Sequence, residues 1–267
     1  MATAVFREVK HRNPACHVTF YTSTKYLEVA ESCPFIDQVR PAEDAPGDAI
    51  WMNYARLIRP GRPLRRPLVK TLGDFLGVKV RDVRPTWSAD SVEVARFQEA
   101  WADLPRPWVV VTRKASGCTP NKDWQNENWE TLIDRLLTGC SVIEVGTPQS
   151  NRRHRSQPNY VDLVGQTTLA QLTAAIAAGD LHVGPLTGTV HIAAALGIPS
   201  VVICGGYEPP QTTDYQGNVI LCSTVSCAPC WLNTPCPYDK KCLREITPDQ
   251  VEAAVNTVWN TEKRAGN

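Results

Sequence analysis

The segment Gly179–Gly206 constrains the fold of this chain more than any other part of its sequence. It predicts a short strand at Leu181–Val183, a glycine-bounded turn, a helix that begins near Thr189, and a second buried strand at Ser200–Cys204. This order of strand, turn, helix and strand is typical of a parallel α/β sheet, in which the turn lies at the carboxyl edge of the first strand.

The turn Gly184–Gly188 is a candidate anion site. The first amides of the following helix have no partner inside the helix and lie at the positive end of its dipole, so they suit a phosphate. Thr187 adds a hydroxyl at the cap position, Gly188 allows a close approach of the backbone, and His191 lies in the first turn. The alternative is a plain β-α-β unit without a ligand, in which His191 is structural.

Length and composition indicate a globular protein. A chain of 267 residues with 43% hydrophobic residues is long enough for two modest domains, and its formal charge of +1 gives no indication of a nucleic-acid partner. Two basic runs, Arg59–Arg66 and Arg152–Arg155, are expected to be solvated surface, although either could meet an anionic acceptor or a membrane face. Without a long apolar run or a signal peptide, we expect a cytoplasmic protein, with the inner face of the membrane as a further location.

We expect an amino-terminal domain at residues 1–100 and a carboxy-terminal domain at 101–267. The first domain is predicted to contain helices at Thr3–His11, Tyr26–Glu31 and Val69–Leu76 and strands at His17–Tyr21, Ile36–Val39 and Val78–Val80. The second is predicted to continue with strands at Trp108–Thr112, Ser141–Val145 and Tyr160–Val164 and helices at Trp129–Leu137 and Leu169–Ala178, and to end in a helix capped by Thr247. Strands that alternate with helices in this way predict a doubly wound parallel sheet.

A polar loop follows the strand Trp108–Thr112 and ends in Lys122 and Trp124. A lysine in such a loop can place a point charge on a diphosphate, whereas a solvated lysine is the simpler explanation when the residue is taken alone.

Four segments of the second half, in this order, resemble the donor-binding half of glycosyltransferase family 9, the heptosyltransferase-like enzymes. They are a K-x-W element at Lys122–Trp124, a strand ending in glycine at Ile143–Pro148, a D-L-x-G-x-T-x-L stretch at Asp162–Leu169, and a loop and helix of the pattern (D/E)-(S/T)-G-x-x-H-x-A-A-A-L-G-x-P at Leu186–Pro199. The resemblance extends over roughly Trp108–Val258, and an ordered set is far more specific than any one piece.

The resemblance implies a GT-B fold of two Rossmann-like domains and an inverting glycosyltransferase. Such an enzyme transfers a sugar, often heptose, from a nucleotide-sugar donor such as ADP-heptose to a glycan, lipopolysaccharide or protein acceptor. The residues that the resemblance assigns to the donor are Lys122, Gly146, Thr147, Gln149, Thr167, Thr168, Thr187, Gly188, Thr189 and His191. Fixed amides and positive charge would stabilise the departing diphosphate.

Two departures from the family pattern stand out. Leu186 replaces the acidic residue that many members carry before the Ser/Thr-Gly pair, so that carboxylate contact is lost or supplied elsewhere. The opening strand and Gly-Asp turn of the family are not found before the predicted first helix, so we expect an amino-terminal domain without its first strand and assign no catalytic base. The alternatives are a fragment, a different way of activating the acceptor, or a noncatalytic nucleotide-sugar-binding accessory protein.

The Cys-rich loop 222–242 carries the spacing C-x2-C-x5-C-x5-C. The four cysteines of this pattern are Cys227, Cys230, Cys236 and Cys242. They suit a tetrahedral thiolate site for zinc or iron, and the alternative is a reduced or partly disulfide-linked loop. A similar segment in the autotransporter heptosyltransferase branch of the family holds iron, and Gly205–Pro210 also resembles that branch, so the resemblance implies a structural metal ion.

Overall fold

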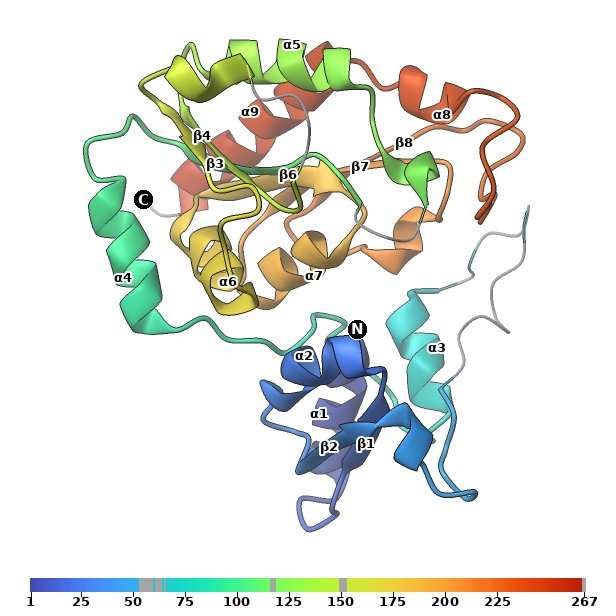
Figure 1. Cartoon of the computed structure of the whole chain (residues 1–267). Coiled ribbons are helices and arrows are strands. Elements are labelled where there is room, and N and C mark those ends of the chain that lie inside the picture. Colours follow the sequence, from blue (N-terminus) through green and yellow to red (C-terminus); the bar gives the residue numbers. More distant parts are fainter. Residues whose placement is uncertain (53–59, 61–63, 65, 116–118, 149–152, 266–267) are drawn as a thin grey trace. The chain divides into compact units, whose positions relative to one another are not determined.

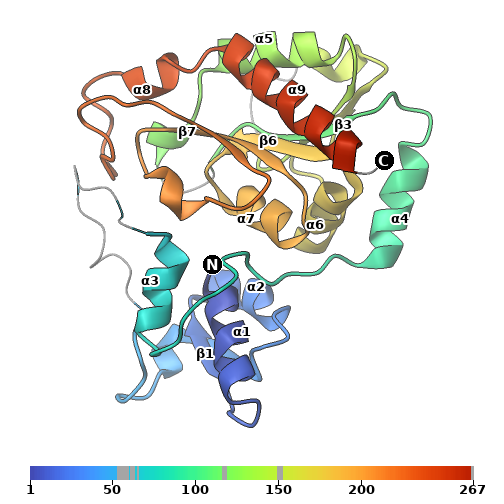
Figure 2. The same cartoon turned by 180° about the vertical axis from the view of Figure 1, so that it is seen from behind.

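The computed structural model describes residues 1–52, 60, 64, 66–115, 119–148 and 153–265. These residues form two separate units, of which the first covers Met1–Ile58 and Leu64–Ser88 and the second consists mainly of Ala89–Asn267. Figures 1 and 2 show the two units from opposite sides.

The first unit is built around a short parallel sheet. In chain order its elements are α1 (Ala2–Arg12), β1 (Thr19–Thr22), η1 (Thr24–Tyr26), α2 (Leu27–Glu31), β2 (Gln38–Pro41), η2 (Ala42–Asp44) and α3 (Leu68–Asp74). Strands β1 and β2 pair in parallel from Thr19 opposite Gln38 to Thr22 opposite Pro41. The apolar faces of α1 and α3 meet in a small core that includes Val5 and Leu72.

One predicted strand of this unit is wrong. Val78 and Val80 are buried in the same core, as their alternation predicted, but Val78–Val80 forms no strand. The Val78 amide donates instead to the carbonyl oxygen of Gly73, at 3.0 Å, which closes the end of α3. Alternating apolar residues therefore mark burial here and not strand pairing.

The second unit is a doubly wound sheet of six parallel strands in the order β5-β4-β3-β6-β7-β8. The strands are β3 (Trp108–Thr112), β4 (Ser141–Val145), β5 (Tyr160–Asp162), β6 (Leu181–Pro185), β7 (Ser200–Gly205) and β8 (Val219–Cys222). All five pairs are parallel. The predicted sheet is confirmed, and β8 is an additional edge strand.

Helices cover both faces of this sheet (Figure 1). The helices and short turns are α4 (Ser91–Ala100), η4 (Pro120–Lys122), α5 (Asn126–Leu136), η5 (Arg153–Ser156), α6 (Leu169–Ala178), α7 (Gly188–Ala195), η6 (Pro210–Thr212), α8 (Lys241–Arg244) and α9 (Pro248–Ala265). One core packs α5 and α9 against the sheet, and the second packs α4 and α6 against its other face. The predicted cap of α9 is present, because Gln250 N donates to Thr247 Oγ1 and Thr247 N donates to Gln250 Oε1.

Candidate functional site

The strand order reverses beside β3, which makes this the point where a ligand is expected. From β3 the chain proceeds outward through β4 and β5, then returns to pair β6 with the other side of β3. The loops that follow β3 and β6 therefore diverge from one edge of the sheet, and open α/β sheets bind ligands at such points. The sequence placed its two candidate anion-binding elements, Lys122 and the turn Gly184–Gly188, in these two loops.

The turn after β6 leads directly into α7, and Thr187 is the residue that caps this helix. The Thr187 hydroxyl accepts no hydrogen bond from the helix. Its carbonyl oxygen accepts from the Val190 amide at 3.1 Å, while no described residue accepts from the amides of Gly188 and Thr189. These two amides remain available to an anion, and a Cβ at Gly188 would meet open space.

His191 lies in the first turn of α7, where its Nδ1 is 2.8 Å from the hydroxyl oxygen of Tyr215. Burial is the main cause that lowers the pKa of His191 below its ordinary value, and the charge of Lys122 acts in the same direction. The imidazole is therefore neutral near pH 7, and when Tyr215 donates to Nδ1 the other ring nitrogen carries the proton. At neutral pH His191 can offer a phosphate an N–H group but no charge.

Lys122 ends η4 and is 9% exposed. Its ammonium donates to the carbonyl oxygen of Leu186 at 3.3 Å, forms an ion pair with Glu208, and lies 4.9 Å from the centre of the Tyr207 ring. The predicted lysine and the predicted turn therefore come together at one place, since Leu186 is the residue before Thr187. The Leu186 side chain is buried in an apolar cluster with Val190, so no carboxylate arises from that position.

The loop between β3 and α5 that carries Lys122, the lysine loop, is hydrogen-bonded to the Cys-rich loop. Asn121 donates from its side-chain amide to the carbonyl oxygens of Leu232 and Thr234, both at 2.8 Å. Thr119 also donates to Leu232, at 3.2 Å, and Lys240 donates to the carbonyl oxygen of Asp123 at 3.0 Å. The position of Lys122 therefore depends on a segment more than one hundred residues away in the sequence.

The other residues that the resemblance assigns to the donor lie in two loops that are joined by a backbone hydrogen bond. Gly146 follows β4 with φ at +123°, a conformation that side chains rarely adopt, and its carbonyl oxygen accepts from the Gly165 amide at 2.8 Å. Thr147 is exposed next to Gly146, and Thr167 is half-buried before α6. The Thr168 hydroxyl accepts from the Gln171 amide at 3.2 Å and so caps α6. Gln149 lies outside the described residues.

The four predicted metal ligands share one neighbourhood. Cys242 interacts electrostatically with Cys230 and Cys227, and Cys230 also interacts with Cys236. Burial raises the pKa of Cys230 and of Cys242, while the amides of Leu232 and Gly206 hydrogen-bond to these two sulfurs and act in the opposite direction.

Thiolates are the ligands that zinc and iron prefer, so the chemistry of this donor set fits such an ion. However, no three His, Cys, Asp or Glu side chains in the described residues are arranged to hold a metal ion. Every cysteine among the described residues is a free thiol. The metal site therefore stays a prediction.

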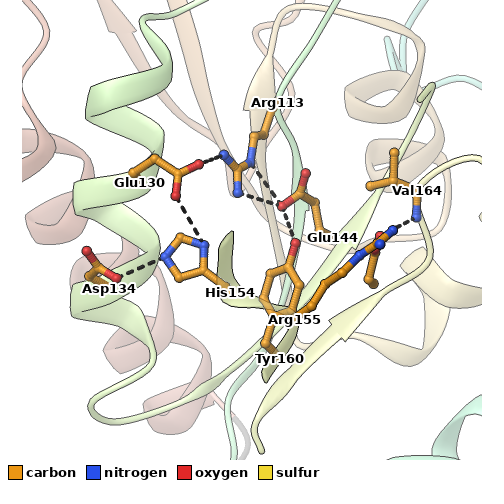
Figure 3. Close-up of polar contacts among 9 residues, drawn as sticks. Arg113, Glu130, Asp134, Glu144, His154, Arg155, Tyr160 and Val164 are labelled. Atoms are coloured by element: carbon orange, nitrogen blue, oxygen red, sulfur yellow. Dashed lines mark hydrogen bonds and ion pairs between the residues drawn. The ribbon is translucent and has the colours of Figure 1, made fainter. Parts of the chain in front are cut away.

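A buried charge network that the sequence did not predict lies beside the lysine loop (Figure 3). Arg113, the residue after β3, pairs with Glu130 of α5 and with Glu144 of β4, whose carboxylate is 2.8 Å from Arg113 Nη2. The Tyr160 hydroxyl donates to Glu144 at 2.6 Å, and His154 lies 3.4 Å from Glu130. A glutamate inside an otherwise apolar strand was the available signal, because a buried carboxylate needs a partner.

No helix among the described residues combines the length and the apolar character needed to cross a membrane.

Comparison with known proteins gives a consistent result. The model of glycosyltransferase family 9 (heptosyltransferase) matches residues 66–241. The lipopolysaccharide heptosyltransferase 1 of Pseudomonas aeruginosa is 29% identical over 149 residues, which are 54% of this chain and 41% of that protein. The lipopolysaccharide core heptosyltransferase OpsX of Haemophilus influenzae is 24% identical over 176 residues, 62% of this chain and 50% of that protein. The chain thus spans about half the length of the curated relatives it matches.

Solved structures show the same fold. The Escherichia coli ADP-heptose lipopolysaccharide heptosyltransferase II superposes with a TM-score of 0.71 at 16% identity, over 98% of this chain and 95% of that one. The dodecameric iron-containing heptosyltransferase TibC in complex with ADP-D-β-D-heptose gives a TM-score of 0.67 at 18% identity, over 97% of this chain and 73% of that one. These likenesses confirm the expected GT-B class of α/β fold.

Proposed function

We propose that this chain, which belongs to glycosyltransferase family 9, transfers a sugar from a nucleotide-sugar donor. The donor is of the ADP-heptose kind, and the acceptor is a glycan, a lipopolysaccharide or a protein. The observation that carries this proposal is the meeting of Lys122 with the turn before α7, where its ammonium is 3.3 Å from the Leu186 carbonyl oxygen. An ammonium and two amides without acceptors, at the switch point of a doubly wound sheet, suit a diphosphate.

In this proposal the acceptor hydroxyl oxygen bonds to the anomeric carbon as the bond from that carbon to the diphosphate breaks, which inverts the anomeric configuration. The proton of the hydroxyl passes to water. Negative charge grows on the leaving diphosphate, and the amides of Gly188 and Thr189 with the Lys122 ammonium stabilise it from fixed positions. His191 adds a neutral N–H. The loops that hold Gly146 and Thr167 would line the nucleoside.

We further propose that Cys227, Cys230, Cys236 and Cys242 hold a structural iron or zinc ion. Such an ion would tie the Cys-rich loop to the rest of its unit, because four thiolates leave no coordination position for a substrate. The proposal includes a cytoplasmic location, because a reducing compartment keeps such thiols available to a metal ion.

Calorimetry with ADP and ADP-heptose tests the donor site. The substitution Lys122→Ala should weaken the binding of both ligands by roughly ten- to a hundredfold, because charge-assisted hydrogen bonds to phosphate are among the stronger ones. Lys114→Ala is the matched control, since Lys114 is an exposed lysine of the same loop. Unchanged affinity in the Lys122 variant, or an equal loss in the control, would contradict the proposed site. Transfer of heptose to an acceptor by the full chain then tests the activity itself.

A further inference from the structure

Glu208 is held at the edge of the sheet beside the proposed donor site. It follows β7, the neighbour of β6, after two glycines that the packing requires. A Cβ on Gly205 would lie 2.6 Å from Leu243 Cδ2, and Gly205 has φ at +59°. A Cβ on Gly206 would lie 3.0 Å from the Cβ of Ala228. This close packing fixes where the chain leaves β7 and so brings Glu208 to the same edge as the turn before α7.

The Glu208 carboxylate has one oxygen engaged and one without a donor. Oε1 forms the ion pair with Lys122, and the two side chains are 12% and 11% exposed. Among the described residues no group donates a hydrogen bond to Oε2 of Glu208. The Lys122 ammonium has three N–H groups, of which one is directed to Leu186 and one to Glu208, so that one remains for a phosphate oxygen.

Charge decides what Glu208 can face when a donor is bound. A carboxylate directed at a diphosphate would repel it, whereas a carboxylate directed at a neutral polyol would accept hydrogen bonds from its hydroxyls. Both the ribose and the transferred sugar of a nucleotide-sugar lie next to the diphosphate and carry hydroxyls. The loops proposed to line the nucleoside follow β4 and β5, on the other side of β3, whereas Glu208 follows β7. Because Glu208 is already bound to the lysine assigned to the diphosphate, the transferred sugar is the part of the donor within its reach.

We propose that Glu208 recognises the sugar of the donor: Oε1 positions Lys122, and Oε2 accepts hydrogen bonds from hydroxyls of that sugar. This inference rests on the proposed function, because it needs a nucleotide-sugar at the Lys122 site. It assigns to β7 and the loop after it a role in sugar recognition, separate from the diphosphate contacts of α7.

The test compares the affinities for ADP and ADP-heptose, measured by calorimetry on the full chain. The ratio of the two dissociation constants isolates the contribution of the sugar. In Glu208→Gln the carboxylate charge is lost, and the advantage of ADP-heptose over ADP should fall roughly tenfold, while ADP itself binds as well as before or more tightly. Glu208→Asp keeps the charge but shortens the side chain, which moves the carboxylate oxygens away from the donor sugar. The ratio should therefore fall in this variant as well. Asp214→Asn, an exposed carboxylate on the same segment, should leave the ratio unchanged.

Three outcomes would overturn the inference. If Glu208→Gln weakens or strengthens both ligands by the same factor, the glutamate acts only through Lys122. If neither Glu208 variant changes the affinity for ADP or for ADP-heptose, the donor sugar does not contact this residue. If the unaltered chain binds neither ADP nor ADP-heptose, the proposed function fails and the inference falls with it, which the first two outcomes do not imply. Thermal unfolding of each variant confirms that the protein compared is folded.

Discussion

The Lys122 ammonium is 3.3 Å from the carbonyl oxygen of Leu186, so a side chain from the loop after β3 contacts the backbone of the loop after β6. The two strands are neighbours in the sheet, although β4 and β5 lie between them in the sequence. The anchoring of Lys122 in its own loop should therefore matter as much as its charge.

Asn121 supplies that anchoring, and Asn121→Ala should weaken ADP binding although the residue is not assigned to the donor. The substitution removes two hydrogen bonds to the carbonyl oxygens of Leu232 and Thr234. We expect a loss of about 1–3 kcal/mol in the free energy of unfolding, because two hydrogen bonds of a buried side chain are lost, and a several-fold loss of ADP affinity. Urea unfolding and calorimetry measure the two effects. Asn128→Ala is the control. If both variants bind ADP equally well, the position of Lys122 does not depend on the hydrogen bonds to the Cys-rich loop.

The Cys-rich loop should carry metal. Elemental analysis of the purified protein should find about one iron or zinc ion per chain, as expected for four thiolates that close a tetrahedral site. Cys230→Ser should lower that content, whereas Cys16→Ser, in the first unit, should not. Because Asn121 is held by the same loop, removal of the ion with a chelator should also reduce ADP affinity. A purified protein that is folded without metal, and whose ADP affinity a chelator does not change, would rule the ion out.

The central sheet could be predicted because its strands are continuous apolar runs. All five residues of β3, Trp108–Thr112, are buried, which is typical of parallel strands covered on both faces. The edge strand β8 was not predicted, although Val219–Cys222 is a short apolar run. Three of its residues are only partly buried and Cys222 is exposed, as is common at the edge of a sheet. The predicted strand at Val78–Val80 is wrong because its alternating valines are buried in the core of the first unit without strand pairing in the described part of the chain.

The site was only partly predictable, because part of it depends on contacts between distant residues. Lys122 and the turn before α7 carry local signals: a lysine after a strand, and glycines before a helix. Glu208 carries none, since its partner Lys122 is 86 positions away and an isolated glutamate in a loop is ordinary. Arg113 was missed in the same way, because the two carboxylates that bind it come from α5 and β4.

Arg113→Met should destabilise the second unit strongly. The guanidinium is 2% exposed and neutralises Glu130 and Glu144, so its removal leaves two carboxylates buried without their cation. We expect a loss of roughly 3–5 kcal/mol in the free energy of unfolding, as is typical when one partner of a buried ion pair is removed. Arg96→Met breaks an exposed pair with Glu93 and should cost less than about 1 kcal/mol. Urea unfolding followed by tryptophan fluorescence compares the two, and similar losses would mean that the network contributes little.

Acid should weaken the fold through His182. The ring is fully buried beneath the end of β6, where a Cβ on Gly184 would lie 2.9 Å from its Cε1, and Thr112 Oγ1 is 3.3 Å from its Nε2. Burial lowers the pKa of His182 to about 3, below the ordinary value of about 6.5. Between these values the unfolded chain binds a proton that the folded chain does not, so the stability is complete above pH 6.5 and declines as the pH falls toward 3.

Replacing this histidine isolates its share of the pH dependence. On lowering the pH from 7.5 to 5.5, His182 should account for a loss of about 1 kcal/mol in the free energy of unfolding. The variant His182→Asn cannot take up the proton, so its stability should fall by that much less over the same interval, whatever its stability at pH 7.5. His17→Asn, at an exposed position of the first unit, should retain the pH dependence of the unaltered protein. Parallel pH profiles for the unaltered protein and His182→Asn would show that the ring is protonated as easily in the fold as outside it.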